Sequence, residues 1–162
     1  MQYLNVNLSG LRGKHHPSLS SIVTTDEVRK LRPHLKFLSG DYLTYQVKFE
    51  QTQKGSPLCK ICSLDNETVC HIITICPEYD EMRKRILLSP SLQVDFQSLV
   101  NNPETHTQFL LDPTSFNLEH RVHRNDPIVH HLFKISRDLC YSIHNRRMKK
   151  LLQLSKEKTN NK

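Results

Sequence analysis

The sequence predicts a mostly α-helical fold, in which a small helical domain with one Cys-Cys-His-Cys (CCHC) zinc knuckle precedes a long basic C-terminal helix. Apolar residues recur every three to four positions in several stretches, as on one face of a helix. Four of the five cysteines fall between Cys59 and Cys76. Only 36% of the 162 residues are hydrophobic, and a chain with so thin a core is expected to need a staple such as a metal ion.

Helix-start and helix-stop signals divide the N-terminal part of the chain. Residues 1–23 are expected to be loosely structured, because glycine and proline interrupt them. Thr24 and Glu27 have the spacing of a capping box, which predicts a helix from Asp26 to Leu38. Pro33 lies inside this helix, so we expect a kink or a late start. The predicted apolar face consists of Val28, Leu31, Leu35 and Leu38.

Three shorter helices are predicted next, over residues 41–53, 67–75 and 78–88. Pro77 stands directly before the last of them, at a position where its missing N–H group is not needed. Acidic residues lead that helix and basic residues follow, an order that suits the helix dipole. Residues 24–88 are therefore predicted to form a helical zinc-binding region.

The C-terminal half is predicted to consist of a connecting segment and a helix. Residues 89–127 are proline-rich, with short helices predicted at 92–100 and near 108–111. Residues 128–162 are predicted to form an amphipathic basic helix, to about residue 155, and a polar tail. The apolar stripe of this helix consists of Ile128, Leu132, Ile135, Leu139 and Ile143.

The positive charge of the chain is concentrated near its C-terminus. The net charge is +7, and residues 121–162 hold 11 basic and 3 acidic side chains. A segment with such an excess attracts polyanions, among which nucleic acids are the most common. The alternative is a solvated basic helix with a frayed tail.

The strongest chemical signal is the pattern Cys59-x2-Cys62-x8-His71-x4-Cys76. Three thiolates and one imidazole form a closed ligand set of the structural-zinc type, with no open position for a catalytic water. Cys70 competes with His71, because neighbours on a helix point about 100° apart and cannot both reach one ion. We expect His71 to be the ligand, since choosing Cys70 would leave a histidine unused beside the site. The alternatives are iron–sulfur or redox chemistry, or free buried cysteines beside a surface histidine.

These residues resemble the zinc-binding region near the C-terminus of non-LTR (LINE-type) retrotransposon reverse transcriptases. The resemblance covers about residues 35–88. The matching positions are Leu38-Ser39-Gly40, Cys59, Cys62, Glu67-Thr68, His71, Cys76-Pro77, Tyr79 and Arg83. It implies a knuckle that helps to hold RNA or DNA. Polymerase activity is not implied, because the paired catalytic aspartates of the family are absent from this chain.

The sequence thus predicts a nucleic-acid-binding module with structural zinc that is not an enzyme. Lysine and arginine side chains beside the knuckle and on the last helix are the predicted phosphate contacts: Lys60, Arg83, Lys84, Arg85, Arg146, Arg147, Lys149 and Lys150. A protein–protein interaction module that docks through helix 128–155, or a non-functional retrotransposon remnant, are the alternatives. RNA or DNA preference stays open.

The expected location is intracellular, in the nucleus or cytoplasm. No apolar run approaches the roughly 20 residues of a membrane-spanning helix. The first residues lack the basic start and apolar core of a secretory signal.

Overall fold

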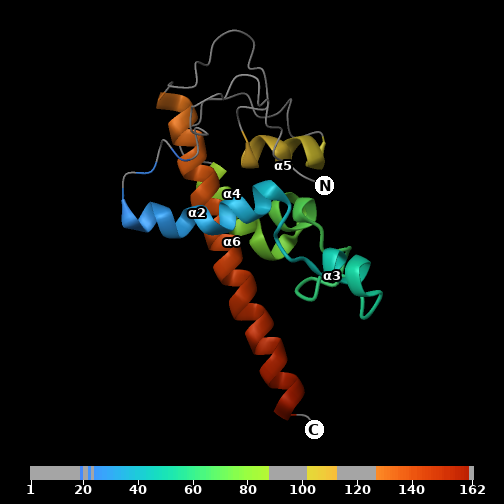
Figure 1. Ribbon diagram of the computed structural model, residues 1–162. Helices are drawn as coiled ribbons and strands as arrows, with labels where there is room; N and C mark the ends of the chain where they lie inside the picture. The colour runs from blue at the N-terminus through green and yellow to red at the C-terminus, as the bar shows by residue number, and fades with distance from the viewer. Residues whose placement is uncertain (1–18, 20–21, 23, 88–101, 113–126, 161–162) are drawn as a thin grey trace.

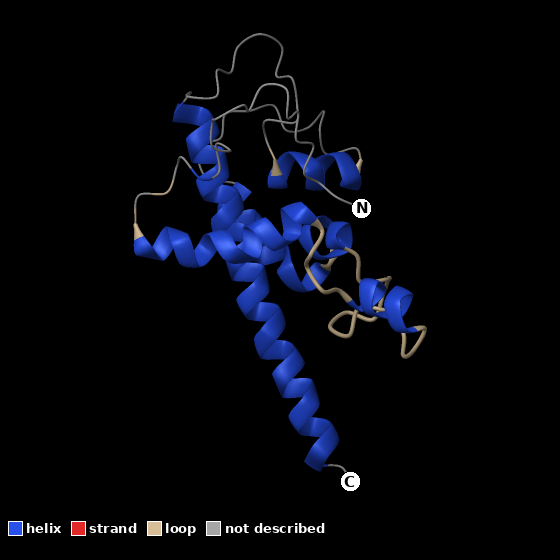
Figure 2. Cartoon of the chain, in the orientation of Figure 1, coloured by secondary structure: helices blue, strands red, loops and turns tan. Residues whose placement is uncertain are grey.

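The computed structural model describes residues 19, 22, 24–87, 102–112 and 127–160. These residues are mostly helical, which confirms the predicted fold class, and Figure 2 shows helices and loops without a strand among them. The predictions for residues 1–18 and for a helix at 92–100 lie outside this part of the chain. None of the helices in the described ranges combines the length and the apolarity that a bilayer-spanning segment requires.

The long helix α6 (Pro127–Asn160) is the element around which the others pack. Helix α2 (Thr25–Ser39) crosses it, and α4 (Asp80–Leu87) and α5 (Pro103–Leu111) also contact it (Figure 1). The last turns of α6 extend beyond the other elements toward the C-terminus (Figure 1). The predicted stripe of α6 is buried at its four described positions, Leu132, Ile135, Leu139 and Ile143.

Helix α2 begins with the predicted capping box. The N–H group of Glu27 donates to Thr24 Oγ1 at 3.3 Å, and the N–H group of Thr24 donates to the Glu27 carboxylate at 3.0 Å. The late start expected from Pro33 does not occur, because the capped helix begins at Thr25 and continues through the proline. Gly40 ends it in the left-handed conformation, with φ of 79°.

The buried face of α2 differs from the predicted one. Val28 and Leu35 stay exposed, at 52% and 37%, whereas His34 and Phe37 are fully buried. The His34 imidazole donates from Nε2 to the backbone carbonyl of Leu111 at 2.9 Å. This bond turns the His34 side of α2 toward α5. Of the predicted apolar face, Leu38 is buried, Leu31 is partly buried, and Val28 and Leu35 are exposed, so periodicity predicted the buried face only in part.

Helix α3 (Tyr45–Thr52) is shorter than the predicted segment 41–53. It starts at Tyr45 because Thr44 is the N-cap, whose hydroxyl accepts a hydrogen bond from the Val47 N–H group at 3.2 Å. It ends at Gln53, which adopts the left-handed conformation with φ of 52°. The short segment before Thr44 therefore links α2 to α3 in non-helical form.

One hydrophobic core joins elements that are far apart in sequence. It includes Phe37 of α2, Ile72 beside the cysteine cluster, Leu111 of α5 and Ile143 of α6. The thiols of Cys59 and Cys76 belong to the same core. The cysteine cluster is therefore built into the helical fold and packs against α6.

Candidate metal centre

The structure brings Cys59, Cys62, His71 and Cys76 together. Their potential ligand atoms, three Sγ atoms and one imidazole nitrogen, all lie within 4.8 Å of one another. Cys59, His71 and Cys76 are buried and Cys62 is partly buried. This cluster could hold one metal ion.

A tight turn positions the first two cysteines. The Cys59 N–H group donates to the carbonyl of Asp65 at 2.9 Å, and the Ser63 N–H group donates to the carbonyl of Cys59 at 2.9 Å. Ser63 adopts the left-handed conformation, with φ of 58°, and an antiparallel bridge pairs Leu58 with Asn66. These bonds close the loop, so the Cys-x2-Cys pair is held by backbone geometry.

A π-helical turn, η2 (His71–Ile75), sets the distance between the last two ligands. The Cys76 N–H group donates to the carbonyl of His71 at 2.6 Å, which is the five-residue bond of a π-helix. Five residues in an α-helix would rotate Cys76 by about 500°, or about 140° away from His71. The wider π turn brings Cys76 back to the side of His71. The predicted helix at 67–75 thus exists in part, beginning at Val69.

His71 presents its Nε2 atom to the cluster, 3.3 Å from the Cys62 Sγ atom. The backbone N–H group of His71 donates to Thr68 Oγ1 at 2.9 Å, which anchors the start of the turn. Its Nδ1 atom is buried and has no hydrogen-bond partner among the described residues. A buried imidazole aimed at three thiols is well placed as a metal ligand.

The donor set fits a tetrahedral ion bound by sulfur and nitrogen. With metal–sulfur bonds of about 2.3 Å, two sulfurs on one ion lie about 3.8 Å apart, so ligand atoms within 4.8 Å need only small shifts. A hydrogen bond between the Cys59 and Cys76 thiols lowers the pKa of Cys59 and raises that of Cys76, which favours one thiolate in the pair. Crowded thiols that favour a thiolate suit a cation, and four protein donors leave no position for a water.

Cys70 lies outside the cluster, although it adjoins His71 in sequence. Its thiol is 3% exposed and lies 3.5 Å from the hydroxyl of Thr74, and burial raises its pKa. Two neighbours on this turn point in different directions, as expected from helical geometry. The structure therefore groups His71, and not Cys70, with the other three cysteines.

Arg83 of α4 closes the far side of the π turn. Its guanidinium donates to the carbonyls of Ile73 and Cys76 and pairs with Asp80. Arg83 is 6% exposed. This corrects the expectation that Arg83 contacts phosphate, because its donors are used inside the protein to hold the ligand-bearing segment.

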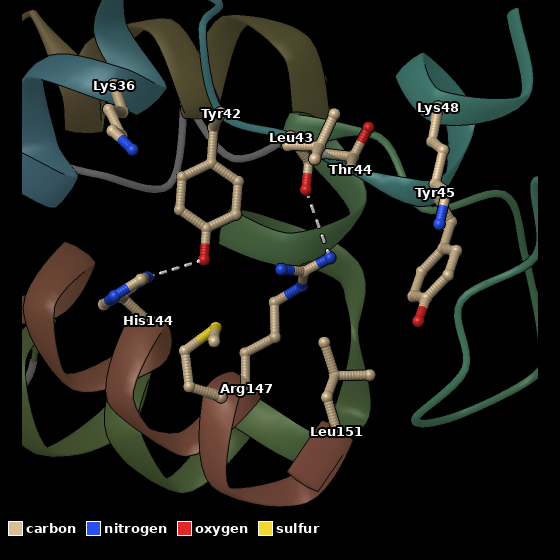
Figure 3. A pocket seen from close by; sticks show the side chains of 10 residues that line it. Lys36, Tyr42, Leu43, Thr44, Tyr45, Lys48, His144, Arg147 and Leu151 are labelled. Carbon is tan, nitrogen blue, oxygen red and sulfur yellow. Dashed lines mark hydrogen bonds between the residues drawn. The ribbon is translucent and has the colours of Figure 1, made fainter. Parts of the chain in front are cut away.

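Arg147 of α6 is buried on the other side of the knuckle. Its Nε atom donates to the carboxylate of Glu67, and its terminal nitrogen donates to the carbonyl of Leu43 at 3.3 Å (Figure 3). Glu67 is 1% exposed, and burial raises its pKa although the hydrogen bond from Arg147 opposes this. Arg147 is thus also removed from the predicted phosphate contacts. Its buried position within the basic run had no signal in the sequence.

The remaining predicted phosphate contacts lie on the surface. Arg146 and Lys150 pair with Glu78 at 2.9 and 3.2 Å, which ties α6 to the 3₁₀ turn η3 (Pro77–Tyr79). Lys84 lies 3.7 Å from Glu81. The Lys60 ammonium lies 5.6 Å from the ring centre of Tyr45. The exposed members of the set are Lys60, Lys84, Arg85, Arg146 and Lys149.

Fold and site together define a mostly helical protein whose core contains a closed Cys3His cluster able to hold a metal ion. No family model, no curated protein and no solved structure matches the chain. The resemblance to the zinc regions of reverse transcriptases consequently depends on the order and spacing of this chain's own residues.

Proposed function

We propose that this chain is a nucleic-acid-binding module whose fold depends on a structural zinc ion. The observation that carries the proposal is the buried cluster of Cys59, Cys62, His71 and Cys76, with its ligand atoms within 4.8 Å of one another. Zinc is the metal that three thiolates and one imidazole prefer in a closed tetrahedral site. The similarity to retrotransposon zinc regions agrees with this choice.

Exposed positive charge supports nucleic acid as the partner. Lys84 and Arg85 lie near the end of α4, and Lys149 and Lys156 lie on the exposed C-terminal turns of α6. Residues 121–162 carry a net charge of +8, from 11 basic and 3 acidic side chains. Such a surface binds phosphates with little sequence selectivity and with strong salt dependence.

Metal analysis tests the zinc half of the proposal. The purified chain should contain one zinc per molecule, and a chelator in excess should reduce far-UV helicity and thermal stability. Zinc binding supplies about 10–16 kcal/mol to the folding of small zinc modules, so a small core built around the site should not survive its removal. Unchanged helicity and melting in excess EDTA would reject the structural role.

Filter binding to single-stranded RNA and DNA tests the second half. Removal of one lysine or arginine that binds a phosphate should reduce the slope of log K against log salt by about 0.7. Replacing Arg85, Lys149 and Lys156 by glutamine should therefore flatten the slope by about 2. The control replaces three exposed basic residues away from the C-terminal turns of α6, namely Arg29 of α2, Lys54 after α3 and Lys134 near the start of α6, and should leave the slope unchanged. A wild-type slope near zero would reject nucleic acid as the partner.

A protein partner is the second candidate, and a specific feature of α6 favours it. Met148 and Leu152 of α6 are 50% and 58% exposed, and the last turns of this helix extend beyond the other elements (Figure 1). Exposed apolar side chains on one helix suit helix docking. Concentration-dependent size in the absence of nucleic acid, abolished by Leu152→Lys, would support this function.

A further inference from the structure

We propose that a cavity between α3 and α6 receives one base of a single-stranded nucleic acid, while Lys36 and Lys48 contact the flanking phosphates. This inference rests on the proposed function and adds a base-binding site to it. The cavity, drawn in Figure 3, has a volume of about 380 Å³. That volume is at the lower end of the range for small-ligand pockets, which suits one nucleotide unit.

Tyr45 supplies the accessible aromatic surface of the cavity, because Tyr42, which also lines it, is only 4% exposed. Tyr42 stacks on Phe37 with ring centres 3.7 Å apart. A hydrogen bond of 3.0 Å joins its hydroxyl to His144 Nδ1 (Figure 3). Tyr42 is therefore a fixed wall. Tyr45, at the start of α3, is half-buried and lines the cavity, with the Lys60 ammonium 5.6 Å from its ring centre. A half-exposed aromatic ring offers a stacking surface for a base.

The charges around the cavity suit an anion. Lys36 and Lys48 are exposed at its rim, and none of the residues that line it is acidic. The Arg147 guanidinium lies 5.3 Å from the Tyr42 ring centre and 5.9 Å from that of Tyr45, and its charge is neutralised by Glu67. The two lysines thus remain available to bind ligand phosphate.

The environment of His144 agrees with a positive potential in the cavity. Burial lowers the pKa of His144, and the charges of Arg147, Lys36 and Arg32 lower it further. Arg147 lies on α6, the helix that carries His144, and Lys36 and Arg32 lie on α2. A nucleotide has a flat π surface and a negative charge close to it. It therefore fits a half-exposed tyrosine flanked by lysines better than an apolar peptide would.

Fluorescence anisotropy with labelled dT8 and the zinc-loaded full chain tests the inference. Tyr45→Leu should weaken binding by about 5- to 150-fold, the range for loss of one stacked base. Tyr45→Phe keeps the ring and should bind within about twofold of wild type. An octamer with abasic sites should bind wild type more weakly than dT8 does and should not respond to Tyr45→Leu. Tyr141→Leu, at a half-buried tyrosine of α6 that does not line the cavity, is the matched control.

The outcomes separate this inference from the proposed function. Equal binding of dT8 by wild type and Tyr45→Leu, with the salt slope intact, overturns the base site alone. Loss of binding in Tyr45→Phe as well as Tyr45→Leu also overturns it, since the ring would then not be what matters. Absence of all oligonucleotide binding by wild type overturns both. Tyr45-dependent binding of an acidic, leucine-containing peptide in place of dT8 overturns it in favour of a protein ligand.

Discussion

Replacement of Arg147 by methionine tests whether the buried ion pair with Glu67 holds α6 to the knuckle. The side chain of Arg147 donates to the Glu67 carboxylate and to the Leu43 carbonyl, and methionine preserves much of its volume without either bond. Glu67 would remain 1% exposed and lose its countercharge. A buried carboxylate without a partner either stays charged at a high cost or takes up a proton.

Protonation limits the electrostatic part of this cost. The ordinary pKa of glutamate is 4.5, so neutralising it at pH 7 costs about 3.4 kcal/mol, from 2.5 pH units at about 1.36 kcal/mol each. We therefore expect Arg147→Met to lower the free energy of unfolding by about 3–4 kcal/mol at pH 7, within the range for broken buried pairs. Because the cost is that of a proton, it should fall by about 1.4 kcal/mol for each pH unit below 7.

Urea denaturation followed by circular dichroism, with zinc present, measures this effect. The double variant Glu67→Gln/Arg147→Met removes both charges and should recover most of the lost stability, as expected for a buried pair whose desolvation offsets its attraction. Lys149→Met, at an exposed neighbour on the same helix, is the control and should change stability by less than about 0.5 kcal/mol. A destabilisation below about 1 kcal/mol in the single variant, or one that does not shrink on acidification, would refute the reasoning.

Two further predictions concern histidines. Purified His71→Ala should contain less than one metal ion per chain, because a ligand is removed, while Cys70→Ala should keep its metal; equal metal content in the two variants would contradict the ligand set. For His144, burial and nearby Arg147 lower the pKa below its ordinary value of 6.5, so the unfolded chain takes up a proton more readily than the folded one. The free energy of unfolding should consequently fall as the pH drops through 6.5. For His144→Gln, urea titrations between pH 7.5 and 5.5 should show a smaller decrease of that free energy than for wild type. Parallel pH profiles for wild type and His144→Gln would contradict this assignment.

The ligand set could be predicted from sequence because its constraints are local. Cys-x2-Cys turns and a histidine nine residues later define a metal site almost independently of the rest of the fold. The π turn could not be predicted in the same way. The extra residue in this turn does not change the pattern of apolar residues. The π turn is required only because Cys76 must lie on the same side as His71.

A long-range polar contact accounts for the part of the α2 face that was predicted incorrectly. Val28 and Leu35 satisfy helical periodicity and still face outward, because His34 bonds to a carbonyl 77 residues away. Periodicity reports which side chains are apolar, whereas packing also depends on the partner that each face meets. On α6 the stripe was predicted correctly, since several elements surround that helix and bury whichever face is most apolar.

The same contacts revise how the positive charge of the chain is distributed. The side chains of Arg83 and Arg147 are buried. The carboxylate of Glu78 pairs with both Arg146 and Lys150. The formal charge is therefore larger than the positive charge that is accessible to a polyanion near the knuckle. The unpaired surface charge shifts toward the exposed turns at the C-terminal end of α6 and toward the lysines beside Tyr45. A nucleic acid bound there would contact a surface whose shape depends on the Cys3His cluster and on the buried arginines.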